Sequence, residues 1–102
     1  MAITVVALCG SPRRGGNTDL MTDAFLEGAR SEGAEVEKFF LDEMTIRPIG
    51  PVGDDFAMRD DIRSDDDARM VLERMAAADV VVYASPVYWQ GVSAQLKCLI
   101  DR

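Results

Sequence analysis

The sequence contains no histidine and only two cysteines, Cys9 and Cys98, which lie near opposite ends of the chain. The absence of histidine excludes histidine-based catalytic triads, proton relays and metal sites. Two distant cysteines without a CxxC spacing form no disulfide framework, and such cysteine usage is typical of a reducing cytoplasm. We therefore predict a cytoplasmic protein whose chemistry does not use a histidine.

Basic residues are also scarce, because 11 lysines and arginines face 18 acidic residues and give a net charge of −7. This balance disfavours nucleic acid and anionic membranes as partners. No apolar run approaches the ~18 residues that a transmembrane helix needs, and the first residues lack the pattern of a signal peptide. The 102 residues, of which 48% are hydrophobic, predict one small α/β domain over residues 1–102.

One loop near the start carries many groups that bind anions. It follows the apolar run Ile3–Leu8, which predicts a buried central strand, and it leads into helical spacing from Asp19 onward. The N–H groups and the dipole of a helix start favour an anion. The loop adds glycines, short polar side chains and two arginines: Gly10, Ser11, Arg13, Arg14, Gly15, Gly16, Asn17 and Thr18. This pattern predicts a phosphate-binding site, and the alternative is an ordinary turn in which small residues only form the bend.

Two common phosphate motifs do not match this loop. A P-loop ends in Gly-Lys-Ser/Thr, whereas the first lysine of this chain is Lys38. The dinucleotide fingerprint requires Gly-x-Gly-x-x-Gly, whereas Gly10 is followed only by Gly15. If the loop binds phosphate, it therefore does so in another way.

The segment after the loop predicts an amphipathic helix that ends near Gly33 and is capped by Asn17 or Thr18. Its expected buried stripe has spacings of three and four residues: Met21, Ala24, Phe25 and Gly28. A second strand is predicted over residues 35–41, which completes a right-handed strand–helix–strand unit.

Residues 42–64 are the least regular segment, because prolines and glycines interrupt them: Pro48, Gly50, Pro51 and Gly53. Their aspartates suit a metal ion by chemistry, but the interleaved arginines favour a solvated acidic loop, so we predict no metal site at Asp54, Asp55, Asp60 and Asp61. A helix follows, with Ser64 as its expected cap and Asp67 in a capping box. Its predicted core face is Ala68, Val71, Leu72 and Met75.

A third, fully buried parallel strand is predicted over residues 80–84. The following loop carries Tyr88 and Trp89, and a flat aromatic ligand would explain large apolar side chains there. The alternative is that they pack beneath the loop or against another subunit. A last helix is predicted from Gly91 to Arg102, with Val92, Leu96 and Leu99 on one face.

Two motifs, GSPRRGGNT and SPVYWQGVSAQLKCLIDR, together resemble the NAD(P)H-dependent FMN reductase family, nearest to its iron–sulfur flavoprotein branch, over Ile3–Arg102. The resemblance implies a flavodoxin-like three-layer α/β/α fold with a parallel sheet, of which the first three strands are present in the order 2-1-3. It assigns the FMN phosphate to Ser11, Arg13, Asn17 and Thr18. It places the flavin ring and ribityl chain at Pro86, Val87, Tyr88 and Trp89, and it implies no catalytic side chain.

The resemblance further implies an oxidoreductase that passes hydride from NAD(P)H to FMN and then electrons to a small-molecule acceptor. Two alternatives stay open. One is a flavin-binding electron carrier without a substrate pocket, and the other is a truncated relic that binds no cofactor and acts only as an assembly partner.

Two features depart from this family. Its iron–sulfur branch carries a cysteine cluster after a proline in the irregular segment, whereas no cysteine follows Pro48 until Cys98, so no cluster is predicted there. Family members also continue through a fourth and a fifth strand. Here the third strand would have a bare edge, which leaves three possibilities: a partner covers it, the sequence is a fragment of a longer protein, or the fold is marginal. We expect a homodimer or larger homo-oligomer and a weakened affinity for FMN.

Overall fold

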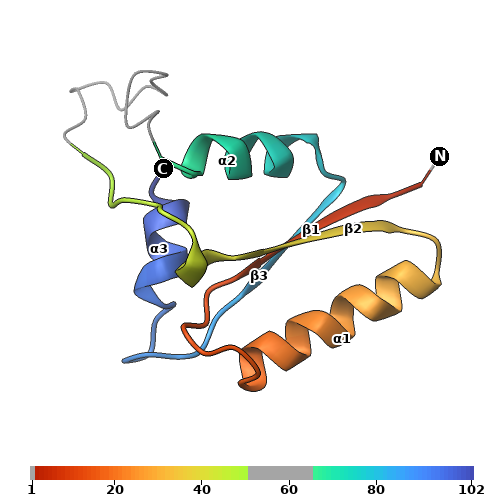
Figure 1. The fold of residues 1–102 in the computed structure, drawn as a ribbon, viewed down its shortest axis with the longest axis horizontal. Helices are drawn as coiled ribbons and strands as arrows, with labels where there is room; N and C mark the ends of the chain where they lie inside the picture. Colours follow the sequence, from red (N-terminus) through yellow and green to blue (C-terminus); the bar gives the residue numbers. More distant parts are fainter. Residues whose placement is uncertain (1, 51–65) are drawn as a thin grey trace.

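The computed structural model describes residues 2–50 and 66–102. Its elements, in chain order, are β1 (Thr4–Cys9), α1 (Asn17–Ser31), β2 (Glu35–Phe40), the short 3-10 helix η1 (Leu41–Glu43), α2 (Ala68–Ala77), β3 (Val80–Ala84) and α3 (Ala94–Ile100). The strands form one parallel sheet in the order β2-β1-β3 (Figure 1). The predicted strand order 2-1-3 of a flavodoxin-like α/β fold is thereby confirmed.

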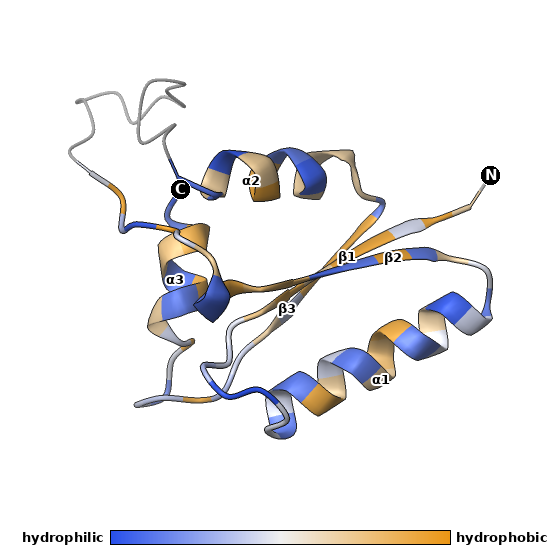
Figure 2. Ribbon diagram, in the orientation of Figure 1, coloured by the Kyte–Doolittle hydropathy of each residue, from blue (hydrophilic) through white to orange (hydrophobic). Residues whose placement is uncertain are grey.

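Strand β1 is the centre of the fold. It is mostly hydrophobic along its length (Figure 2), and it is buried on both faces. Val6 and Leu8 pack with residues of α2 and α3 in the larger core cluster. Val5 and Ala7 point to the opposite face and pack with Leu26 of α1. This alternation produces the three layers, because each face of a central strand needs its own apolar cover.

Helix α1 buries a different face from the one predicted. Met21 and Phe25 are 72% and 52% exposed, and Ala24 and Gly28 are exposed as well, so the predicted stripe is wrong. The buried residues are instead Asp19, Thr22 and Leu26. Two of these are polar and satisfied by hydrogen bonds to Gly15, Lys38 and the Thr18 carbonyl, so a purely apolar pattern misses the inward face.

Helix α2 confirms the predicted core face, with Ala68 and Val71 buried and Leu72 and Met75 packed against the same cluster. Asp67 precedes the helix, but its carboxylate accepts the Thr45 N–H at 2.7 Å and makes no cap hydrogen bond. Because the helix begins at Ala68 with Asp67 as its N-cap residue, Asp67 does not hold the third helical position that the predicted capping box gives it. The other predictions for this segment, on Pro51, Gly53, the aspartates Asp54, Asp55, Asp60 and Asp61, and Ser64, lie outside the described residues.

The last two elements differ in part from their predictions. Strand β3 is not fully buried: its Tyr83 is 55% exposed. The reason is that, within the described part of the chain, β3 pairs only with β1. Helix α3 begins at Ala94 rather than Gly91, because the Ser93 hydroxyl accepts the Leu96 N–H and caps it there. Leu96 and Leu99 are buried as predicted, whereas Val92 is exposed. Within residues 2–50 and 66–102, no helix has the length and apolar character needed to cross a membrane.

A buried ion pair joins α3 to the segments on either side of residues 48–65. Asp66 and Arg102 meet at 2.7 Å, and their side chains are almost completely buried. Asp66 also accepts the N–H groups of Arg47 and Ala68, both at 3.0 Å. Burial opposes the charged carboxylate, but the bonds from Arg102 and the two N–H groups outweigh it and lower the pKa of Asp66 to about 2.

We predict that Asp66 makes the fold acid-sensitive. Since its pKa is about 2 in the folded state against an ordinary 3.8, its carboxylate contributes roughly 2 kcal/mol above pH ~4, and this is lost as the pH falls toward 2. In urea unfolding, Asp66→Asn should cost at least that at pH 7 and show a smaller difference from the wild type at pH 2.5. Asp101→Asn, which breaks the more exposed pair with Lys97, is the control and should cost less than about 1 kcal/mol. An Asp66→Asn effect that is the same at both pH values would contradict this account.

Candidate functional site

The loop after β1 and the loop after β3 begin side by side, at the carboxyl ends of these two neighbouring strands (Figure 1). β1 and β3 end in register, and the Gly10 N–H donates to the Ala84 carbonyl at 2.8 Å. A Cβ at Gly10 would lie 2.6 Å from Ser93 Oγ and 3.0 Å from Leu96 Cβ. Only glycine therefore allows the first loop to lie this close to the start of α3.

Among the residues that the structure describes, no side chain caps the start of α1. The N-cap residue is Gly16, so the capping role predicted for Asn17 or Thr18 is wrong. Both residues instead lie in the first helical turn. The preceding Gly15 has a φ of +77°, and no atom lies within 4 Å of the place where its Cβ would be. First-turn N–H groups that no side chain caps, next to an open glycine loop, form an arrangement that binds anions.

The two arginines of this loop have different surroundings. Arg13 is exposed, its side chain passes beside Gly16, and it forms no ion pair with a residue of the described ranges. Arg14 instead forms an ion pair with Glu43, donating from Nε to Oε1 at 3.1 Å, and its guanidinium lies 4.0 Å from the centroid of the Phe40 ring. The hydrogen bond between them raises the pKa of Arg14 and lowers the pKa of Glu43. The fold thus engages Arg14, whereas Arg13 forms no ion pair within the described part of the chain.

Ser11 is buried, and its hydroxyl is engaged within the loop. Ser11 Oγ accepts the Arg13 N–H at 3.0 Å and donates to the Arg13 carbonyl at 3.3 Å. This is a side-chain turn of the kind that serine forms in loops. In this structure Ser11 shapes the loop, and its direct contact with a phosphate stays a prediction.

A buried polar group that the sequence reasoning missed supports the loop from below. Asp19 is 5% exposed, and its Oδ2 accepts the Gly15 N–H at 2.8 Å. Lys38 of β2 donates to Asp19 Oδ1 and, at 2.6 Å, to Asp23. Two features of the sequence could have indicated this group. Asp19 and Asp23 are four residues apart and so share one face of the helix, and Lys38 shares a face of β2 with Val36, which packs toward α1.

These bonds hold both Asp19 and Lys38 in their charged forms. The bond from the Gly15 N–H, and then the bond from Lys38, lower the pKa of Asp19. Burial opposes the charge on Lys38, but the hydrogen bonds to Asp19 and Asp23 outweigh it and raise the pKa of Lys38.

The loop after β3 ends in a tight, strained turn. Tyr88 and Gly91 exchange two backbone hydrogen bonds, with N···O distances of 3.1 and 3.0 Å. The two residues between them, Trp89 and Gln90, have φ values of 50° and 63°. Such values are unfavourable for residues other than glycine, asparagine and aspartate, and strain of this kind often occurs at functional sites.

The predicted flavin-contacting residues of this loop lie together at the surface. Trp89 is fully exposed, Val87 and Tyr88 are exposed, and Pro86 is half-buried. The alternative that the two aromatic side chains pack beneath the loop is therefore wrong for Trp89. Ser85 closes the base of the loop, because its hydroxyl accepts the Ser93 N–H at 2.8 Å and donates to the Pro86 carbonyl at 2.7 Å.

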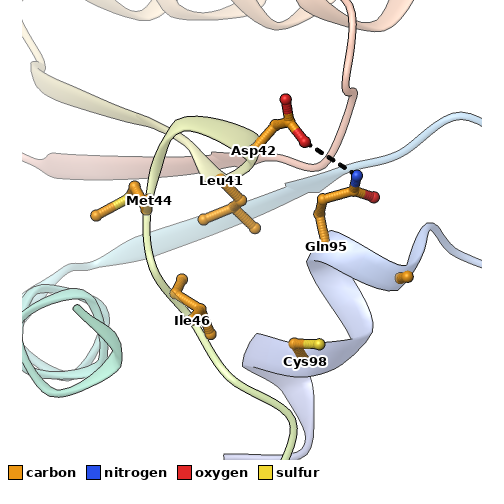
Figure 3. Close-up of a pocket in the computed structure, with 7 residues that line it drawn as sticks. Leu41, Asp42, Met44, Ile46, Gln95 and Cys98 are labelled. Carbon is orange, nitrogen blue, oxygen red and sulfur yellow. Dashed lines mark hydrogen bonds between the residues drawn. The ribbon is translucent and has the colours of Figure 1, made fainter. Parts of the chain in front are cut away.

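A separate hollow of about 260 Å³ lies between the segment after β2 and α3 (Figure 3). A hydrogen bond of 3.1 Å from Gln95 Nε2 to Asp42 Oδ1 crosses its rim. Its lining residues are Leu41, Asp42, Met44, Ile46, Ala94, Gln95 and Cys98. None of the predicted cofactor-binding residues lines this hollow.

The fold and the two loops define a class: a parallel α/β protein with an uncapped, glycine-rich start of its first helix and exposed aromatic residues at the neighbouring strand end. The sequence profile of the NADPH-dependent FMN reductase family matches residues 3–102. The chain belongs to this family.

Its relatives carry related names. It is 37% identical over 100 residues to an iron–sulfur flavoprotein of Methanosarcina thermophila, covering 96% of this chain and 51% of that protein. An iron–sulfur flavoprotein of Methanocaldococcus jannaschii is also 37% identical, over 96% of this chain and 50% of its own length. YwqN of Bacillus subtilis, provisionally named an NAD(P)H-dependent FMN-containing oxidoreductase, is 30% identical over the same shares. The chain thus spans about half the length of these relatives, and no solved structure matches it.

The residues of this chain do not fit an iron–sulfur cluster like the one named in these relatives. Such clusters are held by several thiolates, commonly four. The chain has two cysteines, of which Cys9 is buried inside β1 and Cys98 lies on α3. The first loop, by contrast, fits a phosphate group because of its uncapped helix start and its available arginine.

We predict that Gly10→Ala destabilises the protein by about 1–3 kcal/mol, because a Cβ there overlaps Ser93 Oγ and crowds Leu96. The matched control is Gly28→Ala inside α1, where a Cβ meets no atom within 4 Å. That change should stabilise the helix by roughly 0.5–1 kcal/mol. Urea unfolding measures both, and equal effects of the two substitutions would refute the close contact at Gly10.

Proposed function

We propose that this chain binds FMN and acts as the cofactor-holding part of an NAD(P)H-dependent oxidoreductase. The observation that carries the proposal is the uncapped start of α1, with Arg13 beside it, at the same sheet edge as an exposed aromatic loop. Membership of the FMN reductase family supports FMN over other phosphate-bearing cofactors.

In this proposal the phosphate binds at the first loop. The N–H groups and side chains of Asn17 and Thr18 donate hydrogen bonds, and the Arg13 guanidinium supplies the positive charge. Ser11 holds the loop in shape through its bonds to Arg13. A local arginine is sufficient for a dianionic group, even in a chain with a net charge of −7, because charges more than about 10 Å away are screened by salt.

The flavin ring would lie against the second loop. Val87, Tyr88 and Trp89 offer apolar and aromatic surface there, and Pro86 stiffens the strand end. When bound, FMN would accept a hydride from NAD(P)H and pass electrons to a small-molecule acceptor. The chain itself needs no acid or base for this chemistry, which agrees with its lack of histidine.

A second candidate is a flavin-binding electron carrier without a substrate pocket. The full exposure of Trp89 supports it, because such a side chain is open to a partner surface. Bleaching of the flavin absorbance by NADPH alone would favour the reductase, whereas bleaching only with an added redox partner would favour the carrier. We also propose a cytoplasmic location, since both cysteines are free thiols.

We predict that the purified chain binds FMN through Arg13. Titration followed by flavin fluorescence should show saturable binding, and Arg13→Ala should weaken it about tenfold, as expected for the loss of a charge-assisted hydrogen bond worth about 1.4 kcal/mol. Arg30→Ala removes the same charge at the far end of α1, where Arg30 pairs with Glu27, and should leave the affinity unchanged. A chain that takes up no FMN, or equal affinities for all three proteins, would overturn the proposal.

We further propose that the chain forms a homodimer or larger homo-oligomer that covers the outer edge of β3. That strand has no charged residue, and Val80 and Tyr83 are exposed at it. Sedimentation should show a dimer or larger species, and Val80→Lys should shift it toward the monomer. A wild-type chain that is monomeric at all concentrations would refute this.

A further inference from the structure

The predicted phosphate site contains a carboxylate of its own. Asp19 lies in the first turn of α1, where the ligand would bind, and it is 5% exposed. Its Oδ2 holds the Gly15 N–H at 2.8 Å and so fixes the glycine loop against the helix. A buried negative charge at this position would repel a phosphate dianion, because screening is weak away from solvent.

The fold cancels this charge from a different element. Lys38 lies in β2, opposite Ala7 of β1, and its side chain is 17% exposed. Its Nζ pairs with Asp19 and, at 2.6 Å, with Asp23. The same hydrogen bonds raise the pKa of Lys38, so the ammonium stays charged at neutral pH.

The other charges nearby do not replace Lys38. Arg14 is committed to Glu43 and lies over the Phe40 ring. Asp23 adds a second carboxylate, although it is more than half exposed and therefore better screened. Without Lys38, the buried carboxylate of Asp19 would keep its negative charge uncompensated next to the proposed phosphate site.

We propose that Lys38 is a positioning residue for the cofactor phosphate: by pairing with Asp19, it lets that carboxylate hold the Gly15 N–H without repelling the phosphate. The inference rests on the proposed function and deepens it. It concerns the phosphate alone, so the affinity for riboflavin, which has the same ring and ribityl chain without a phosphate, should not depend on Lys38.

The experiment titrates FMN and riboflavin separately into wild type, Lys38→Met, Asp19→Asn and the double variant, using flavin fluorescence. Lys38→Met should weaken FMN at least about tenfold and change riboflavin less than about threefold. Adding Asp19→Asn to Lys38→Met should restore FMN affinity to within about threefold of wild type, because the neutral pair has no charge left to cancel and the amide oxygen still accepts the Gly15 N–H.

The control for net charge is Arg74→Met. Arg74 of α2 pairs with Glu37, the neighbour of Lys38 in β2, and its loss should leave the affinities for both ligands unchanged. The riboflavin affinity of each variant reports whether the second loop is intact, and circular dichroism checks the fold.

Three results would overturn the inference. One is a Lys38→Met variant that binds FMN as tightly as wild type does. Another is an equal loss of FMN and riboflavin affinity in that variant, and the third is a double variant that binds FMN no better than Lys38→Met. The last two would indicate a purely structural role. A wild-type chain that binds neither ligand would instead refute the proposed function, and with it this inference.

Discussion

The rest of the structure depends on the close contact at Gly10, where the first loop meets the end of β3 and the start of α3. The Gly10 N–H donates to the Ala84 carbonyl, and the missing side chain of Gly10 lets Ser93 Oγ lie close to the backbone. Both loops are thereby held together at the carboxyl ends of β1 and β3. β1 makes this possible because it is the central strand, paired with β2 along one edge and with β3 along the other. The groups proposed to bind the phosphate and those proposed to bind the flavin ring thus become neighbours, although some seventy residues separate them along the chain.

The strands and their order were predictable, because short β-branched runs and glycine-rich turns are local signals. The inward face of α1 was not. Its buried residues Asp19 and Thr22 are polar. Asp19 accepts hydrogen bonds from Gly15 and from Lys38 of another element, and Thr22 donates to the Thr18 carbonyl. A pattern of apolar residues alone favours Met21 and Phe25, which the structure exposes.

The ends of the elements depended on single hydrogen bonds that the sequence does not specify. Ser93 caps α3 because Ser85 binds its N–H, and Gly16 rather than a polar residue starts α1. Residue types suggested which groups lie at the site, but not which are already engaged. Arg13 and Arg14 are both arginines, yet it is Arg14 that forms the ion pair with Glu43 and lies over the Phe40 ring. Two of its relatives are named iron–sulfur flavoproteins, but the two cysteines of this chain are fewer than the thiolates that hold such a cluster.

The central claim is that the first turn of α1 binds the cofactor phosphate, and amide NMR tests it most directly. In a titration of the 15N-labelled chain with FMN, we predict that the largest shifts fall on the N–H groups of residues 15–18, with a second group in residues 86–91. Inorganic phosphate should shift the first group only. Shifts confined to the hollow around Cys98, or none in residues 15–18, would contradict the account.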